Sequence, residues 1–469
     1  MIKKHLYKAK TITEGVLRNG RKEIFGVFKA LKERKFEGNK GIAIKNSAYQ
    51  LLTTAIGKGG TLLFTIIIAR MLMPELFGLY SLALSTTVVF SAPSDLGLGT
   101  TLIRFVSKSL GKNKPKEAKS YFSYLLKAKA ILSITSAALL LLSAKFIANN
   151  YYQKPISLAL IAGAIYIVLI NFTTLFEVLF QSANNFKQAM YKEAIFQLSR
   201  LILIPLAILL TIQKFSTEIS LFWIISSLAL CYLITLIFIS RRAYKTINFL
   251  KFEGQQLSIT KKKEVNRFWA LVSTTVLSGI FLGYVDTIIL GRYVSASYIG
   301  FYQAALNLIS SIIPLIPIST VLFPIFSRLK GERLEKGFNR SIRFSLLLSS
   351  FFFVASIIFS NLVVKLVYGS EYLPSSLILK IFALNIFLIP ISALFESYFV
   401  SIGKPQVMAK YLIFSTTINL VLNYLFVANL VKYSEYYAIM GSAFAVLISR
   451  TVYLILQITK RKKSVHSTN

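Results

Sequence analysis

Long apolar runs, separated by short basic segments, are the feature that most limits what this chain can fold into. Each run has about 20 residues or more, the length that an α-helix needs to cross roughly 30 Å of hydrocarbon. A mean hydropathy of +0.63 is too apolar for a soluble chain of 469 residues. The short alternating segments of a β-barrel are absent. We therefore predict an all-α polytopic membrane protein with about twelve transmembrane helices. The spans lie at about 46–69, 77–106, 121–144, 155–181, 190–212, 219–240, 267–290, 299–327, 340–362, 374–400, 407–428 and 436–458.

The chain also repeats itself. The stretch 284–302 has a weaker copy at 69–80, and a shift of 222 residues lays Arg70 on Arg292 and Gly78 on Gly300. A second pair, 175–182 and 394–401, matches at a shift of 219. Two echoes at nearly one offset indicate two homologous halves. We predict two pseudo-symmetric six-helix lobes around a central cavity.

The repeat and the connections divide the chain into five parts. They are a basic N-terminal extension (1–45), a first lobe (46–240), an inter-lobe linker (241–266), a second lobe (267–458) and a basic tail (459–469). The extension has no apolar core of signal-peptide length, so we expect it to be retained. It fits either an amphipathic helix on an anionic leaflet or a solvated leader that fixes orientation.

The basic residues, which give a net charge of +36, are distributed as a membrane topology requires. They concentrate in every second connection and in both tails, whereas the alternate connections hold only isolated lysines and arginines. This asymmetry predicts cytoplasmic N- and C-termini in the cell membrane, and it does not indicate a nucleic-acid partner. Pro93 in the second span and Pro314 in the eighth predict bends at matching places of the two halves.

Several cations fall within the spans. Lys58, Arg200 and Lys380 lie deep enough to cost on the order of 3 kcal/mol each, so each should face a cavity or a partner. Gln50 shares a polar stripe with Lys58, and Arg200 has Gln197 one turn away, whereas Lys380 has Asn385 nearby. A purely structural role is the alternative for all of them. The other cations, Lys127, Lys129 and Arg450, lie near helix ends and are expected to snorkel to the interface.

Four acids also fall within the spans. Glu177 and Glu396 occupy matching places, as helix-end partners of Lys187 and Lys404 or as a gate that closes the inner face. Asp95 follows Pro93 in a segment that could unwind. Asp286 breaks the repeat, because Phe64 stands at the corresponding position, and it either pairs with Arg292 or is functional.

The sequence carries no recognisable catalytic or metal-binding constellation. The two histidines, His5 and His466, lie in the tails, and the one cysteine, Cys231, lies within a span. Gly279 and Gly283 form a G-x-x-x-G pattern, which favours close helix packing. We therefore predict no catalytic residues, no metal and no cofactor.

Three motifs carry a family resemblance. They are A-R-x-L-x-P-E-x-F-G-x-Y-x-L-A at 69–83, D-L-G-L-G-x-x-x-x-R-F at 95–105, and D-x-x-I-L-G-R followed by G-x-Y at 286–302. In order and spacing they resemble the polysaccharide biosynthesis transporter family. This family comprises the O-antigen and lipid-linked oligosaccharide flippases of the multidrug/oligosaccharidyl-lipid/polysaccharide exporter superfamily. The family's L-G-P is Leu72-Met73-Pro74 here, and the extension before residue 46 lies outside the resemblance.

The resemblance implies an alternating-access flippase that moves a polyprenyl-phosphate-linked or polyprenyl-pyrophosphate-linked oligosaccharide from the inner to the outer leaflet. Lys58 and Arg200, with Lys380 and Gln50, would then bind the pyrophosphate or acidic sugars. Asp286 or Asp95 would couple transport to a proton or sodium gradient. The implied partners are the lipid-linked sugar and membrane lipids, for a monomeric transporter that works with glycosyltransferases.

Other functions remain open at this level. A multidrug or organic-cation antiporter of the same fold would use the four acids, although the cations of the first half oppose a cationic substrate. A lipid II flippase would show fourteen spans. A membrane glycosyltransferase or polymerase would need larger outer loops than this chain has, so we expect a transporter and not an enzyme. A non-transporting scaffold would leave the buried charges unexplained.

Overall fold

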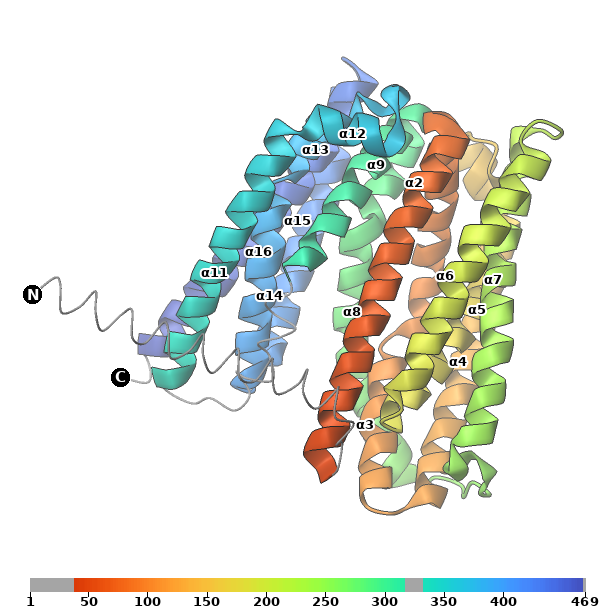
Figure 1. Ribbon diagram of the computed structural model, residues 1–469, viewed down its shortest axis with the longest axis vertical. Helices are drawn as coiled ribbons and strands as arrows, with labels where there is room; N and C mark the ends of the chain where they lie inside the picture. Colours follow the sequence, from red (N-terminus) through yellow and green to blue (C-terminus); the bar gives the residue numbers. More distant parts are fainter. Residues whose placement is uncertain (1–37, 317–331, 467–469) are drawn as a thin grey trace, which may run out of the picture.

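Two bundles of helices lie side by side in the computed structural model, which describes residues 38–316 and 332–466 (Figure 1). The first bundle contains α2 (Gly38–Asp95), α3 (Leu98–Gly111), α4 (Pro115–Phe146), η1 (Ile147–Tyr152), α5 (Ser157–Ser182), α6 (Phe186–Thr211), α7 (Thr217–Thr246) and η2 (Asn248–Lys251). The second contains α8 (Ile259–Tyr293), α9 (Ala296–Ile312), η3 (Ile313–Leu315), α11 (Glu332–Ile358), α12 (Ser360–Tyr368), η4 (Ser370–Tyr372), α13 (Ser375–Phe382), α14 (Asn385–Ser401), α15 (Pro405–Leu430) and α16 (Glu435–His466). No strand occurs within these described ranges.

The helices follow the apolar runs. Among the described residues, nine helical stretches are long and apolar enough to cross a membrane, and the first, Lys45–Gly111, covers two predicted spans. The seventh and eighth predicted spans fall on α8 and α9, and the end of the eighth lies outside the described residues. The all-α, two-lobed fold is thus confirmed. Of the predicted extension 1–45, residues 1–37 lie outside the described ranges, and 38–45 are the first residues of α2.

Helix contacts repeat between the lobes. In the first lobe α2 packs on α6, α4 on α5 and α5 on α7. In the second lobe α8 packs on α15, α11 on α14 and α14 on α16. These pairs correspond in chain order, so the internal sequence repeat is also a repeat of packing.

The helices break where the prolines predict. After Pro93, the helix is interrupted at Leu96 (φ 31°) and Gly97 (φ 72°), before α3 continues in nearly the same span. In the second lobe α9 gives way to η3, which contains Pro314. A further break at Met73 (φ 56°, ψ 170°) divides α2 into two helices. The first span and most of the second are therefore joined in α2, with the break at Met73 between them.

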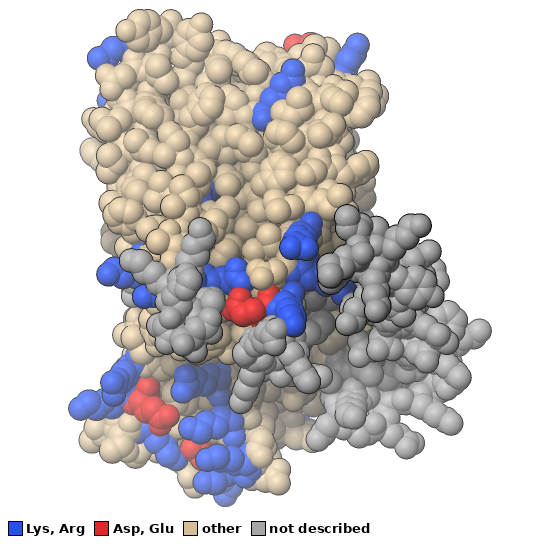
Figure 2. Space-filling view, turned by 90° about the vertical axis from the view of Figure 1, so that its left-hand side faces the viewer, with Lys and Arg blue, Asp and Glu red and all other residues tan. Residues whose placement is uncertain are grey.

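Charge is segregated between the two ends of the molecule. Figure 2 shows most lysine and arginine in the lower half of this face, at its lower end and around a few acids at mid-height, with only a few near the upper end. At the lower end the predicted linker holds the end of α7, η2 and the first turns of α8. Those turns are tied to the first lobe, because Lys261 Nζ lies 2.9 Å from Glu117 Oε1 and Tyr124 donates to Asn266 at 2.9 Å. The start of the second half is thus anchored on the first.

The predicted G-x-x-x-G packing in α8 is wrong. A Cβ atom built on Gly279 or Gly283 would meet no atom of another residue within 4 Å. Among the residues that the structure describes, no neighbouring helix approaches these glycines closely enough to need the missing side chain.

Candidate functional site

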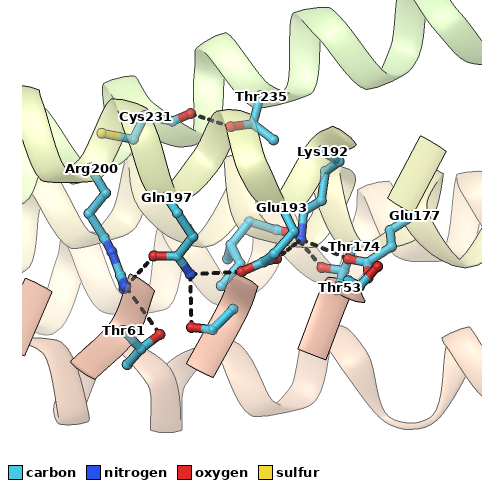
Figure 3. Close-up of polar contacts among 12 residues, drawn as sticks. Thr53, Thr61, Thr174, Glu177, Lys192, Glu193, Gln197, Arg200, Cys231 and Thr235 are labelled. Atoms are coloured by element: carbon cyan, nitrogen blue, oxygen red, sulfur yellow. Dashed lines mark hydrogen bonds and ion pairs between the residues drawn. The ribbon is translucent and has the colours of Figure 1, made fainter. Parts of the chain in front are cut away.

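A buried ion-pair cluster joins α5 and α6 in the first lobe (Figure 3). Lys192 Nζ lies 2.8 Å from Glu177 Oε2 and 3.1 Å from Glu193 Oε2. The three side chains are at most 18% exposed. One buried lysine therefore neutralises part of the charge of two partly buried carboxylates, which holds the end of α5 against α6.

The cluster continues along α6 toward α2. Gln197 Nε2 donates to Glu193 Oε1 at 2.7 Å and to the Gly57 carbonyl at 3.2 Å. Arg200 Nη2 donates to Gln197 Oε1 at 2.6 Å and to Thr61 Oγ1 at 3.1 Å. Positions 193, 197 and 200 share one helical face, which explains why the bonds form one continuous chain. We call Glu177, Lys192, Glu193, Gln197, Arg200 and Thr61 the first-lobe network.

Small residues of α2 make room for this network. A Cβ on Gly60 would lie 2.6 Å from Gln197 Oε1, closer than real Cβ contacts come. The Arg200 guanidinium also lies 4.2 Å from the centre of the Phe64 ring, a cation–π contact. The predicted Arg200–Gln197 contact is confirmed. Because two cations face two carboxylates, the first-lobe network carries no net positive charge by itself.

Lys58 and Gln50 lie outside the network. Both are exposed on α2, and neither side chain forms a hydrogen bond or ion pair with a residue that the structure describes. Lys58 follows Gly57, whose carbonyl accepts from Gln197. Lys58 is thus an exposed cation next in the chain to a residue that contacts the network, and its own side chain bonds to no member of the network.

Lys380 is not brought to the other cations. It lies on α13, which packs on α9, α16 and α11 of the second lobe. It forms no ion pair with any residue in the described ranges, and Asn385 is buried with its Oδ1 unpartnered there. The predicted neighbours Lys380 and Asn385 therefore do not bond to each other.

Asp95 lies at the predicted break between α2 and α3, beside a cavity of about 280 Å³. The cavity is also lined by Gly97, Lys129 and Gln181 of the first lobe and by Val276 of α8, so it lies where the lobes meet. Asp95 Oδ1 accepts from Lys129 Nζ at 3.0 Å, and its side chain is 48% exposed. A carboxylate half open to an interlobe cavity can meet a ligand there.

The snorkelling predicted for Lys129 is wrong. Its side chain is only 2% exposed and turns inward to Asp95. A buried ammonium needs a counter-ion, and the break at Leu96 and Gly97 brings one within reach. The sequence reasoning missed this pair because 34 residues separate its members.

Asp286 is buried in the second lobe and does not pair with Arg292. Tyr302 donates to Asp286 Oδ2 at 2.5 Å and the Thr287 amide donates to Oδ1 at 2.7 Å. Beyond Tyr302, Ser442 Oγ lies 3.4 Å from the phenol oxygen and donates to Asn423 Oδ1 at 2.6 Å. Asn419 extends the chain, with its Oδ1 2.5 Å from Asn423 Nδ2. We call Asp286, Tyr302, Ser442, Asn423 and Asn419 the second-lobe network.

The predicted partners of Glu177 and Glu396 are both wrong. Glu177 pairs with Lys192 and not with Lys187, because Lys192 is on the face of α6 that meets α5. Glu396 is exposed on α14 and accepts from Tyr453 at 2.9 Å, with no ion pair to Lys404. The two repeat-related acids thus have different environments. Their role as gates stays a prediction.

Sequence reasoning also missed Glu193, Asn419, Asn423 and Ser442. The spacing of Glu193 from Gln197 and Arg200 on one helical face was the available signal. No local signal links Asp286 and Tyr302 to the other members of the second-lobe network, since the members come from four helices, α8, α9, α15 and α16. Among the described residues no group of three or more histidine, cysteine, aspartate or glutamate side chains could hold a metal ion.

The fold matches that of a solved flippase structure. The structure of a lipid II flippase, MurJ, in its inward closed conformation aligns with a TM-score of 0.68 and 15% identity, over 88% of this chain and 87% of that one. At this identity the likeness establishes the fold alone. The class that the fold defines is a two-lobed helical membrane protein with many spans.

The sequence comparison specifies the family within this class. The profile of the polysaccharide biosynthesis protein family matches residues 43–330, more than half of the chain, and a MatE profile matches residues 272–425. The chain belongs to the polysaccharide biosynthesis protein family, as the motifs predicted.

Two curated relatives are archaeal. The probable low-salt glycan biosynthesis flippase Agl15 of Haloferax volcanii is 25% identical over 186 residues, which is 38% of each chain. The membrane protein MJ1068 of Methanocaldococcus jannaschii is 22% identical over 438 residues, 89% of this chain and 83% of its own. The similarity to the second relative therefore extends over both lobes.

Proposed function

We propose that this protein is a flippase for lipid-linked oligosaccharides and not an enzyme. Membership of the polysaccharide biosynthesis family is the observation that carries this proposal. The Haloferax relative, named as a glycan biosynthesis flippase, and the fold shared with a lipid II flippase support it. The substrate is a sugar headgroup on a polyprenyl phosphate or pyrophosphate, which moves from the cytoplasmic to the outer leaflet of the cell membrane.

The first lobe supplies the polar wall for the headgroup. Lys58 is exposed and unpaired among the described residues, so it is the cation best placed to meet a phosphate. Arg200 is held by Gln197 and Thr61, and Gln50 offers an exposed amide on the same helix as Lys58. Asp95, half open to the interlobe cavity, can accept hydrogen bonds from sugar hydroxyls. Lys380, on the opposite lobe, contacts the headgroup only when the lobes approach each other.

We assign ion coupling to Asp286. Asp286 is 2% exposed. Its carboxylate is linked through the hydroxyls of Tyr302 and Ser442 to the side-chain amides of the second-lobe network. A buried carboxylate among neutral oxygen ligands can take up a proton or a sodium ion. Either ion would neutralise the negative charge of Asp286 inside the second lobe. Since Tyr302 belongs to the repeated motif of α9, a change at Asp286 reaches a helix that packs against α2 of the other lobe.

Reconstituted vesicles test the flippase activity. A labelled polyprenyl-linked sugar is placed in the membrane, and an added enzyme reports how much of it becomes accessible on the far leaflet. We expect accessibility to rise only with the protein present. Reversing charge at Lys58 and Arg200 together (Lys58→Glu, Arg200→Glu) should abolish the rise, and unchanged transport would refute the assigned cation site.

A multidrug antiporter is the second candidate, because the MatE profile covers part of the second lobe. It would bind organic cations at Asp286 and Asp95. The two functions separate in the same vesicles: an antiporter would exchange a fluorescent organic cation for protons or sodium and leave the lipid-linked sugar in place.

The long apolar helices indicate a protein that crosses a membrane several times. The side of the membrane on which each end lies is our proposal. The basic end shown in Figure 2 faces the cytoplasm together with both termini. The protein works as a monomer that receives its substrate from glycosyltransferases on that side.

A further inference from the structure

The two copies of the repeated sequence pack against each other at the end of the molecule opposite the basic face. A Cβ on Gly78 would overlap the carbonyl oxygen of Ala296, and a Cβ on Gly300 would overlap the carbonyl oxygen of Pro74. A shift of 222 residues lays Gly78 on Gly300 and Pro74 on Ala296. The contact is therefore reciprocal. Each glycine lies against a backbone carbonyl of the other repeat copy, and the two carbonyls occupy corresponding positions of the repeat.

The paired arginines of the repeat cross between the lobes at the same end. Arg70 of the first lobe donates from Nε to the Val367 carbonyl at 2.8 Å, and also to the Leu366 carbonyl. Arg292 of the second lobe donates to the Asn150 carbonyl at 3.1 Å and to the Tyr151 carbonyl at 2.5 Å. The acceptors lie at the ends of α12 and η1. Each arginine thus caps the C-terminal carbonyls of a helix in the opposite lobe.

The residue before each arginine adds a matching bond. Tyr372 of the second lobe donates to the Ala69 carbonyl at 2.9 Å. Lys154 of the first lobe donates to the Gly291 carbonyl at 2.7 Å. Ala69 and Gly291 correspond under the same shift of 222 residues. The backbone and the side chain of both repeat copies are therefore bonded across the lobes.

We propose that Arg70 and Arg292 form a paired latch that closes the outer end of the transporter and opens once in each transport cycle. The opening in each transport cycle rests on the proposed function. The closed latch itself is defined by the contacts between the lobes. The glycines Gly78 and Gly300 allow the backbones to meet, and the arginines hold them there. The latch is positioning machinery and does not bind the headgroup.

The chemistry of the latch suits a contact that must open. Both arginines are exposed residues, so water can replace the carbonyls when the lobes part. Their acceptors are helix-end carbonyls, which water also solvates readily. Opening therefore leaves neither arginine buried without a hydrogen-bond partner. A buried ion pair in the same place would cost several kcal/mol per ion to rearrange.

A cysteine reporter tests the latch without any substrate. In a Cys231→Ser background, Leu82→Cys places a thiol at a fully buried position that faces Gly291 across the lobes. We expect Arg70→Gln and Arg292→Gln each to raise the rate of labelling by a membrane-impermeant maleimide about fivefold, because each removes charge-assisted hydrogen bonds. Arg70→Lys should give a smaller rise.

The glycines give an independent route to the same opening. Gly78→Ala and Gly300→Ala should each raise the labelling rate to a similar extent, since the added methyl group forces the repeat copies apart. Gly59→Ala is the matched control in α2, because a Cβ there meets nothing within 4 Å, and it should leave the labelling rate unchanged.

The outcomes separate the latch from the proposed function. Wild-type labelling rates in Arg70→Gln, Arg292→Gln and both glycine variants, in protein present at normal amounts in the membrane, would overturn the latch even if sugar transport were observed. Raised labelling in these variants, with no transport of the lipid-linked sugar by the wild-type protein, would support the latch and defeat the flippase assignment.

Discussion

At the level of single residues, the buried Lys192 is shared by two partly buried carboxylates and therefore has a large effect on stability. Lys192→Met would leave Glu177 and Glu193 without a counter-ion, at a cost of about 3–5 kcal/mol in the free energy of unfolding. Thermal unfolding of the purified protein in detergent measures the loss. Glu177→Gln is the control and should cost less, because Lys192 keeps Glu193. Equal losses in the two variants would contradict this account.

Asp286 offers a second test at this scale. Asp286→Asn keeps the shape of the side chain, and its amide oxygen can still accept from Tyr302, so the protein should fold. It removes the charge that a proton or sodium ion would neutralise. We expect transport in vesicles to lose its dependence on an imposed ion gradient. Glu371→Gln, at an exposed carboxylate of η4, should retain it. Gradient dependence that survives in Asp286→Asn would exclude this residue from coupling.

At the level of elements, α8 carries two glycines that no contact with a described residue requires. Gly279→Ala and Gly283→Ala should each stabilise the protein by roughly 0.5–1 kcal/mol, since alanine is the better helix former and a Cβ meets no other residue there. The midpoint of unfolding measures the change. A loss of stability would show that a partner packs on this face of α8.

The positions of the helices and of their breaks were largely predictable from the sequence. Helix positions were predictable because the thickness of a membrane sets the length of an apolar run. The break at Leu96 was predictable from Pro93 and the glycines after it, and the end of α9 from Pro314. The G-x-x-x-G interpretation failed because the pattern describes a surface that can pack closely, and nothing in it says that a helix lies there.

At the level of the whole molecule, the distribution of charge predicts the orientation. In a Cys231→Ser background, Lys112→Cys lies between α3 and α4, and Lys214→Cys lies between α6 and α7. A membrane-impermeant maleimide added to intact cells should label the cysteine at 214 and not the one at 112. After the cells are opened, both should react. Labelling at 112 in intact cells would reverse the topology.

The amino-acid sequence alone determined the membrane class, the family motifs and the duplication, because these depend on run length, composition and internal similarity. It also indicated which charges lie in the spans. It did not determine their partners. Glu177 bonds to Lys192 and not Lys187, Asp95 bonds to Lys129, and Asp286 bonds to Tyr302 and not Arg292. Partner choice depends on how each helix is rotated and which neighbour it crosses, and only the tertiary structure decides both. The reciprocal contacts of Arg70 and Arg292 were decided in the same way, because a repeat in sequence does not say which surfaces of its copies meet.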